Sequence, residues 1–173
     1  LKLGITPGSL IRVEEGENEI IVQRSSHSLA EVYIELTNRC NLDCRTCMRN
    51  VWHEPMGDMQ KETFTAVFES VKAIQPAPKI FFGGFGEPLA HKGAVEMIAR
   101  AKASGSTVEM ITNGILLTKD VAHRLVEIGI DRVWVSIDGA TRESHEDVRL
   151  GDNLPVVIEN IYKKLEEGYS RLQ

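Results

Sequence analysis

The feature that most constrains the fold is an alternation of short apolar runs with helical patterns from residue 31 onward. The runs are rich in β-branched or aromatic residues, which is typical of strands buried on both faces. They are Val32–Leu36, Lys79–Phe82, Thr107–Ile111 and Arg132–Ile137. Between them, apolar residues recur with helical spacing, as over 64–74. Strands that alternate with helices pair in parallel through right-handed crossovers. The sequence therefore predicts an α/β fold of about four βα units, either half of a (β/α)8 barrel or most of a doubly wound sheet.

The two ends of the chain add to this outline. Residues 1–28 are typical of a small β-hairpin and a linker, and residues 29–173 form the α/β unit. Thr118 is placed to cap a helix over 119–128, and Gly129 is placed to end it. We therefore expect an N-terminal hairpin followed by one α/β domain.

Composition narrows the class of protein. Of the 173 residues, 42% are hydrophobic and 26% are charged, which is enough apolar side chain for a packed core. No apolar run approaches the roughly 20 residues that span a bilayer. No secretory signal is visible, so we expect a cytoplasmic location and no membrane partner. The net charge of −5 disfavours a nucleic-acid partner, because no basic stripe dominates.

The unusual polar residues all follow predicted strands. Three cysteines come after the first strand, the glycine-rich run 83–88 after the second, and residues 112–114 (TNG) after the third. Ser136 and Asp138 end the fourth. In parallel α/β folds the loops at this edge converge, and sites are built there. The sequence therefore predicts one site on this rim.

The cysteines indicate a metal centre. Cys40, Cys44 and Cys47 are the only cysteines, with the spacing C-x3-C-x2-C, which is a poor disulfide framework. A [4Fe–4S] cluster usually takes four thiolates, so three would leave one iron open to a substrate or cofactor. The alternatives are a zinc site completed by His53 or His91, and three thiols that bind no metal. Spacing and position favour the cluster.

In combination, these motifs resemble the radical S-adenosylmethionine (SAM) superfamily. The stretch 35–47 (ELTNRCNLDCRTC) is similar to the cluster-binding loop of that family. The resemblance continues through GFGEPL at 84–89, TNG at 112–114 and SIDG at 136–139. It points to the subgroup of molybdenum-cofactor biosynthesis protein A and the peptide and cofactor maturases. The run 44–52 (CRTCMRNVW) looks most like maturases of tungsten-containing oxidoreductases. The implied fold is a partial (β/α) barrel of the radical SAM type.

The resemblance also implies roles for the rim residues. A [4Fe–4S] cluster would be held by Cys40, Cys44 and Cys47, with SAM on its fourth iron. The implied cofactor-binding residues are Thr46, Gly84, Phe85, Gly86, Glu87, Asn113, Ser136 and Arg149. The loop 84–87 is expected near the methionine amino group, Ser136 near the ribose or carboxylate, and Arg149 near the carboxylate. Asp138 is expected only to cap the next turn.

The activity implied by the resemblance is reductive cleavage of SAM to methionine and a 5′-deoxyadenosyl radical. The radical abstracts hydrogen from a peptide, protein or small-molecule substrate. A ferredoxin or flavodoxin supplies the electron, and no acid–base residue is needed, so none is predicted as catalytic. The alternatives are a non-catalytic iron–sulfur or zinc binding module and an RNA-modifying radical SAM enzyme. The acidic composition disfavours the second alternative.

The sequence departs from the family pattern at three points. Thr46 stands where the family has an aromatic residue beside the adenine, and Phe85 stands where it has glycine. The chain also stops after the fourth βα unit, whereas the family barrel has six. An uncovered edge along Arg132–Ile137 invites pairing with another chain. We therefore expect either a fragment of a longer enzyme or self-association through that edge.

Overall fold

The computed structural model describes residues 11–15, 20–24, 29–74, 77–139, 141–151 and 153–166. Strands β1 (Ile11–Glu15) and β2 (Ile20–Arg24) pair antiparallel, which confirms the predicted hairpin. The turn between them and the predicted linker lie outside the described residues. The division of the chain at residue 28 stays a prediction.

Four parallel strands form the main sheet, in the order β3-β4-β5-β6. They are β3 (Glu31–Ile34), β4 (Lys79–Phe82), β5 (Val108–Thr112) and β6 (Arg132–Val135). Because strand order follows chain order, each connection crosses between neighbouring strands. The predicted α/β fold with four βα units is confirmed. The first and last strands end two residues earlier than predicted, because the chain leaves the sheet there to form the rim.

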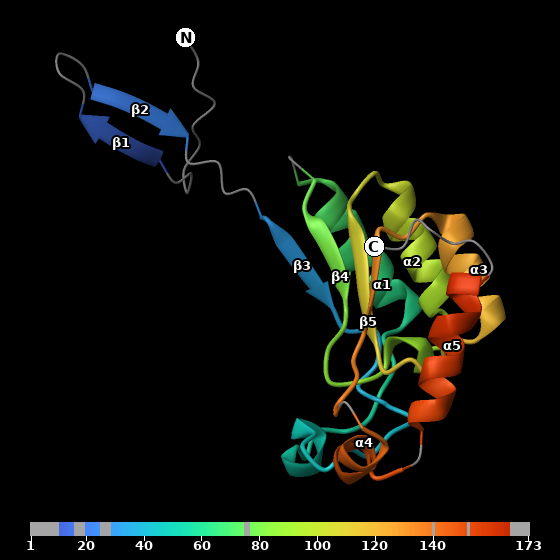
Figure 1. Cartoon of the computed structure of the whole chain (residues 1–173). Helices are drawn as coiled ribbons and strands as arrows, with labels where there is room; N and C mark the ends of the chain where they lie inside the picture. The colour runs from blue at the N-terminus through green and yellow to red at the C-terminus, as the bar shows by residue number, and fades with distance from the viewer. Residues whose placement is uncertain are drawn as a thin grey trace.

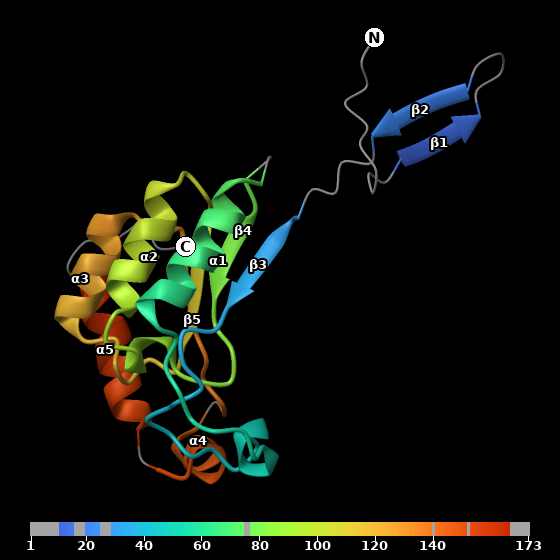
Figure 2. The same ribbon diagram turned by 180° about the vertical axis from the view of Figure 1, so that it is seen from behind.

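The longer helices lie along one side of the sheet (Figure 1 and Figure 2). They are α1 (Lys61–Lys72), α2 (Ala94–Ala103), α3 (Lys119–Ile128) and α5 (Leu154–Glu166). Their apolar faces form the core with the sheet, and Phe64 and Ile98 are completely buried. Thr118 accepts a hydrogen bond from the Val121 N–H and caps α3, and Gly129 ends it with a φ of 76°. Both predicted helix signals are confirmed.

The opposite face of the sheet mixes charged and aromatic side chains. Ion pairs of 2.9–3.6 Å link the side chains of Glu31, Lys79, Glu109 and Arg132 into one chain. On the same face Tyr33 contacts Phe81, with ring centroids 4.8 Å apart. Tyr33 and Trp134 are exposed there. The charges on this face neutralise one another and leave exposed aromatic rings beside them.

The helix α4 (Arg142–Arg149) was not predicted. Its sequence, RESHEDVR, is polar on nearly every side, so apolar spacing does not reveal it. It begins at a capping box, in which the Thr141 hydroxyl accepts from the Ser144 N–H and the Ser144 hydroxyl accepts from the Thr141 N–H. The expectation that Asp138 caps this turn is wrong, because its carboxylate pairs with Arg149 instead, at 2.7 Å.

Two short 3-10 turns lie at the rim, η1 (Met48–Val51) and η2 (Pro88–Ala90). Both ribbon views show η1 and α4 together beyond the carboxyl ends of the strands (Figure 1 and Figure 2). The Arg45 N–H donates to the Val148 carbonyl at 2.8 Å, which ties the cysteine segment to α4. In the part of the chain that the structure describes, no helix is long and apolar enough to cross a membrane.

Candidate functional site

The glycine-rich loop after β4 packs directly on the segment that leads into the cysteines. The Phe85 and Gly86 N–H groups both donate to the Glu35 carboxylate, at 2.5 and 3.1 Å. A Cβ on Gly86 would lie 1.9 Å from the Thr37 carbonyl oxygen. The Glu87 N–H donates to the Arg39 carbonyl at 2.8 Å. The two loops therefore meet backbone against backbone, and glycine is required for that approach.

Glu87 is the centre of a second set of contacts. Its side chain is only 2% exposed and accepts hydrogen bonds from the Thr112 hydroxyl and the Asn113 N–H, both at 2.7 Å. The Leu89 N–H donates to it at 3.1 Å. Burial raises the pKa of Glu87, although these donors and the Arg149 charge oppose the shift. Glu87 therefore joins the loops after β4 and β5, a structural role that the sequence did not predict. Its predicted contact with SAM stays a prediction.

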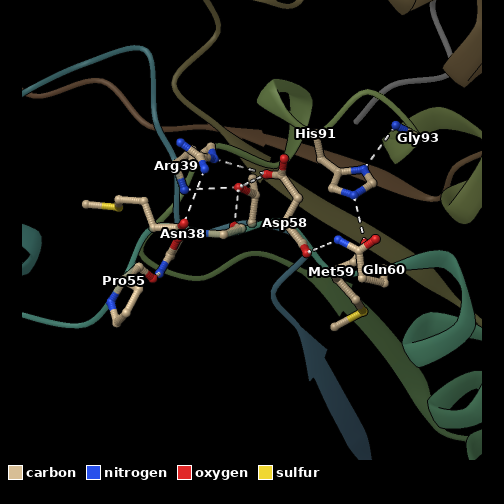
Figure 3. Close-up of polar contacts among 11 residues, drawn as sticks. Asn38, Arg39, Pro55, Asp58, Met59, Gln60, His91 and Gly93 are labelled. Carbon is tan, nitrogen blue, oxygen red and sulfur yellow. Dashed lines mark hydrogen bonds and ion pairs between the residues drawn. The ribbon is translucent and has the colours of Figure 1, made fainter.

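The chain returns alongside the cysteine-bearing loop through residues 55–59 (Figure 3). The Thr37 hydroxyl donates to the Asp58 carboxylate at 2.6 Å and accepts from the Arg39 N–H at 3.0 Å. Asn38 contacts both sides of this segment, donating to the Pro55 carbonyl and accepting from the Gly57 N–H. These contacts fix the backbone immediately before the first cysteine.

His91 extends this frame and does not lie free at the rim. Its Nε2 lies 3.0 Å from the Met59 carbonyl, and its Nδ1 accepts from the Gly93 N–H at 3.0 Å (Figure 3). The Nδ1 acceptor role requires the proton on Nε2, so the neutral imidazole bridges two loops. With both nitrogens engaged, His91 has a structural role and does not complete a zinc site in this arrangement.

The three thiols lie half-buried beyond β3, each near a nitrogen donor. Cys40 Sγ accepts from the Leu42 N–H at 3.4 Å and from Asn113 Nδ2 at 3.6 Å. Cys44 Sγ accepts from Arg149 Nη1 at 3.6 Å. Burial raises the pKa of Cys40, and these donors partly offset the shift. Asn113, which follows β5, and Arg149, which ends α4, therefore both reach the cysteine loop.

The third thiol, Cys47, has its donor within the same loop. Arg49 folds back so that its Nη2 donates to the Leu42 carbonyl at 2.5 Å. Burial alone would lower the pKa of Arg49. The nearby Cys47 and Cys40 thiols favour its charged form more strongly, so the pKa of Arg49 is raised. Arg49 Nε is buried and has no hydrogen-bond partner among the described residues. Apolar spacing and motif position do not distinguish Arg49 from the neighbouring arginines Arg39 and Arg45.

Ser136 and Arg149 form one unit at the end of β6. Arg149 is only 7% exposed, and its Nη2 donates to the Ser136 carbonyl at 2.7 Å and hydroxyl at 3.0 Å. Its Nε lies 2.7 Å from the Asp138 carboxylate. The guanidinium is thus fixed between β6 and Cys44.

Thr46 and Phe85, the two side chains that differ from the family pattern, lie on the outside of the rim. Thr46 is exposed. Phe85 is 46% exposed and forms an edge-to-face contact with Trp52, with ring centroids 4.8 Å apart. Met48 and Val51 are also exposed beside Trp52 in the chain. Because Gly84 and Gly86 flank it, Phe85 is the only side chain that the tip of this loop presents.

Other possible sites are separate from this rim. Among the described residues, no three His, Cys, Asp or Glu side chains converge to hold a single metal ion. A cavity of about 360 Å³ lies between α1 and α2. Asp58, Phe64, His91 and Arg100 are among its lining residues, and none of the predicted site residues reaches it. The predicted residues do not enclose this cavity.

Sequence reasoning missed two residues that build the site. Glu35 anchors the glycine-rich loop and was noticed only as part of a motif. Its signal was a carboxylate at the end of a strand, next to a loop rich in unpaired N–H groups. Asp58 anchors Thr37 and lies 21 residues further along the chain, so no local pattern indicated it.

Comparison with known proteins matches the fold and the order of motifs. The model of the radical SAM superfamily matches residues 34–171, and the chain belongs to this superfamily. It is 34% identical over 134 residues to the tungsten-containing aldehyde ferredoxin oxidoreductase cofactor-modifying protein of Pyrococcus furiosus, covering 78% of this chain and 37% of that protein. It is 34% identical over 116 residues to the AdoMet-dependent heme synthase of Methanosarcina barkeri, covering 66% and 33%. The resemblance and the subgroup predicted from the motifs are confirmed.

Solved structures support the same fold. BtrN in complex with AdoMet and 2-DOIA superposes with a TM-score of 0.59 at 24% identity, over 65% of this chain and 47% of that one. Methylornithine synthase (PylB) gives 0.57 at 14% identity, over 83% and 43%. Members of the superfamily are enzymes that use a [4Fe–4S] cluster and SAM. The chain spans about a third of the length of the curated relatives above, 37% and 33%.

Proposed function

We propose that this chain is part of a radical SAM enzyme that acts in the maturation of a cofactor or peptide. In this proposal Cys40, Cys44 and Cys47 hold the [4Fe–4S] cluster. The observation that carries it is the set of donors around the thiols, since Asn113 Nδ2 reaches Cys40 Sγ and Arg149 Nη1 reaches Cys44 Sγ, both at 3.6 Å. Donors to sulfur are what an anionic iron–sulfur cluster requires from its surroundings.

The residues present fit such a cluster. Each thiol is half-buried, and the structure records only long N–H contacts of 3.4–3.6 Å for two of them. The buried Nε of Arg49 has no described acceptor in the middle of this loop. A cluster places its thiolates on different irons, so the thiols need not converge on one ion. When bound, the cluster supplies the electron that cleaves SAM to methionine and a 5′-deoxyadenosyl radical.

The chain's own residues then bind and orient SAM. We assign Arg149 to the carboxylate of SAM, because a guanidinium can bind both carboxylate oxygens. We assign Ser136 to the ribose or the carboxylate. The Arg149 and Ser136 side chains are held together at the end of β6. We assign its amino group to the loop 84–87, which includes Glu87. Asn113 faces the same space, and the Thr46 backbone is assigned to the adenine. Phe85 narrows the entrance beside Trp52.

A substrate in cofactor maturation is supported by the relatives. One is called a cofactor-modifying protein and another a heme synthase. Peptide substrates remain within this proposal, because the same subgroup includes peptide maturases. A ferredoxin or flavodoxin is the proposed electron donor in a reducing cytoplasm, where thiols stay available for iron.

The alternative to a longer enzyme is self-association through β6. This strand lies at the end of the described sheet, with Trp134 46% exposed, so its free N–H and C=O groups can pair with another chain. Sedimentation of the purified protein should give a species heavier than one chain. A monomer with sharp thermal unfolding would contradict this part of the proposal.

Iron analysis and a cleavage assay test the proposed function. Anaerobic reconstitution should load about four irons per chain and make the protein oxygen-sensitive. SAM and dithionite should then yield 5′-deoxyadenosine, and Cys44→Ala should give neither iron nor product. One tightly bound zinc without iron uptake would refute the cluster. Iron uptake without SAM cleavage would favour the non-catalytic binding module.

A further inference from the structure

Arg49 differs from the other two arginines of the cysteine loop. Arg39 and Arg45 have side chains that are 55% and 61% exposed, and each pairs with a surface carboxylate. Arg49 instead turns inward from η1 and donates to the Leu42 carbonyl. Leu42 lies between the first two cysteines, so the guanidinium bridges the loop from its third cysteine to its first two.

The Arg49 guanidinium is incompletely satisfied in this position. Its Nε is buried and has no partner among the described residues. A buried N–H without an acceptor destabilises the folded protein, and more so when the group is charged. A guanidinium stays protonated at any physiological pH, so it cannot relieve the cost by losing its charge. This donor therefore has room for an acceptor that is bound within the loop, beside the cysteine sulfurs.

We propose that Arg49 is a positioning residue that donates its Nε–H to a sulfur atom of the [4Fe–4S] cluster and thereby raises the cluster's reduction potential. The inference rests on the proposed function. One-electron reduction adds negative charge to the cluster. A neighbouring cation and a hydrogen bond to sulfur stabilise that added charge. Hydrogen bonds to the sulfurs and net charge are the main means by which a protein sets such potentials.

The test compares three variants of the reconstituted protein with the wild type. Iron content is measured first, and an anaerobic redox titration then gives the reduction midpoint of the cluster. Arg49→Met keeps the apolar stem and removes both charge and donors. Arg49→Lys keeps the charge and loses the planar set of donors. Arg45→Met is the matched control, because it removes a cation from the same loop at an exposed position paired with Asp147.

The expected order of midpoints is clear. Arg49→Met should have the most negative midpoint at the wild-type iron content, Arg49→Lys an intermediate one, and Arg45→Met the wild-type value. Equal midpoints for Arg49→Met and the wild type would overturn the inference, as would an equal shift in Arg45→Met. If Arg49→Met takes up no iron, the midpoint of Arg49→Lys tests the inference instead. A midpoint of Arg49→Lys equal to that of the wild type would overturn the inference. A wild-type protein without iron contradicts the proposed function instead.

Discussion

The carboxylates and the thiols of the rim are held in different ways. Glu35 and Glu87 each accept at least two hydrogen bonds of 2.5–3.1 Å from protein N–H or O–H groups. Cys40 and Cys44 accept only contacts of 3.4–3.6 Å, and sulfur is a weak acceptor. The carboxylates are therefore committed to the protein, whereas the thiols keep their capacity to bind a metal.

This contrast separates the rim residues into two groups: a frame of polar side chains that hold the loops together, and the three thiols that are the proposed ligands of the cluster. The frame, built around Glu35, Glu87 and Asp58, joins the loops after β3, β4 and β5 through hydrogen bonds between protein groups. The ligands are placed by the frame and contribute little to it. Substitutions in the frame should therefore lower the free energy of unfolding, while substitutions of the thiols should remove iron and leave that free energy almost unchanged.

The largest loss of stability is expected for Gly86→Ala. The new Cβ would lie 1.9 Å from the Thr37 carbonyl, so two backbone segments must separate and their hydrogen bonds break. We expect a loss of about 3 kcal/mol in urea unfolding, together with loss of iron uptake. Gly57→Ala is the matched control, since nothing lies within 4 Å of its Cβ position. Equal stability of the two variants would contradict the close approach of the loops.

A smaller loss is expected for Glu87→Gln. The amide nitrogen of glutamine must face either the Asn113 N–H or the Leu89 N–H, which leaves a buried donor without an acceptor. The expected cost is about 2 kcal/mol. Glu96→Gln is the control, because that carboxylate is exposed on α2 and should change stability by less than about 0.5 kcal/mol. Affinity for SAM, measured on the folded variant, tests the predicted cofactor contact separately.

The same substitution predicts a pH dependence. Burial raises the pKa of Glu87 above its ordinary value of 4.5, so folding favours the protonated form. The stability that this proton contributes is complete below about pH 4.5 and is lost as pH rises through the raised pKa. The difference in unfolding free energy between wild type and Glu87→Gln should therefore fall over that range. A difference that rises with pH would contradict the raised pKa of Glu87.

The rim could be predicted from the sequence because strand periodicity fixes where each βα loop emerges. Asn113 was placed near the cysteines on that basis and Arg149 through the family resemblance, and both contact cysteine sulfur. The direction in which a side chain points is not periodic. Glu87 has a predicted contact with the cofactor, and its oxygens also accept three hydrogen bonds from the protein that no periodicity indicates. Glu35 received no role because its partners lie 50 residues away.

The elements that the sequence did not reveal are those without an apolar stripe. α4 is defined by its capping box and by two buried polar residues, His145 and Arg149. A polar helix is indistinguishable from a loop when only hydrophobic spacing is considered. The inward position of Arg49 could not be predicted either. Arg39, Arg45 and Arg49 lie in the same loop and look alike in the sequence, but they contact different partners.

An intermediate loss is expected for Asp58→Ala. This carboxylate accepts the Thr37 hydroxyl at 2.6 Å and lies 3.7 Å from Arg39 Nε, but it is partly exposed. Solvent can replace part of what is lost, so we expect about 1 kcal/mol in urea unfolding. Iron uptake should become slower, because the backbone before Cys40 is less firmly held. Glu127→Ala on α3 offers an exposed control carboxylate away from the rim, and an equal effect there would remove Asp58 from the frame.

The smallest loss of stability is expected for Cys44→Ala. The thiol is half-buried and accepts one long contact from Arg149, whose guanidinium keeps Ser136 and Asp138 as partners when the sulfur is removed. The backbone contacts of Cys44 with Cys47 do not depend on its side chain. Urea unfolding of the metal-free protein should therefore change by less than about 0.5 kcal/mol. Reconstitution of the same variant should give no stable cluster, because two thiolates remain for a cluster that needs at least three protein ligands here. A large loss of stability without metal would mean that the thiols belong to the frame, and the distinction between frame and ligands would fail.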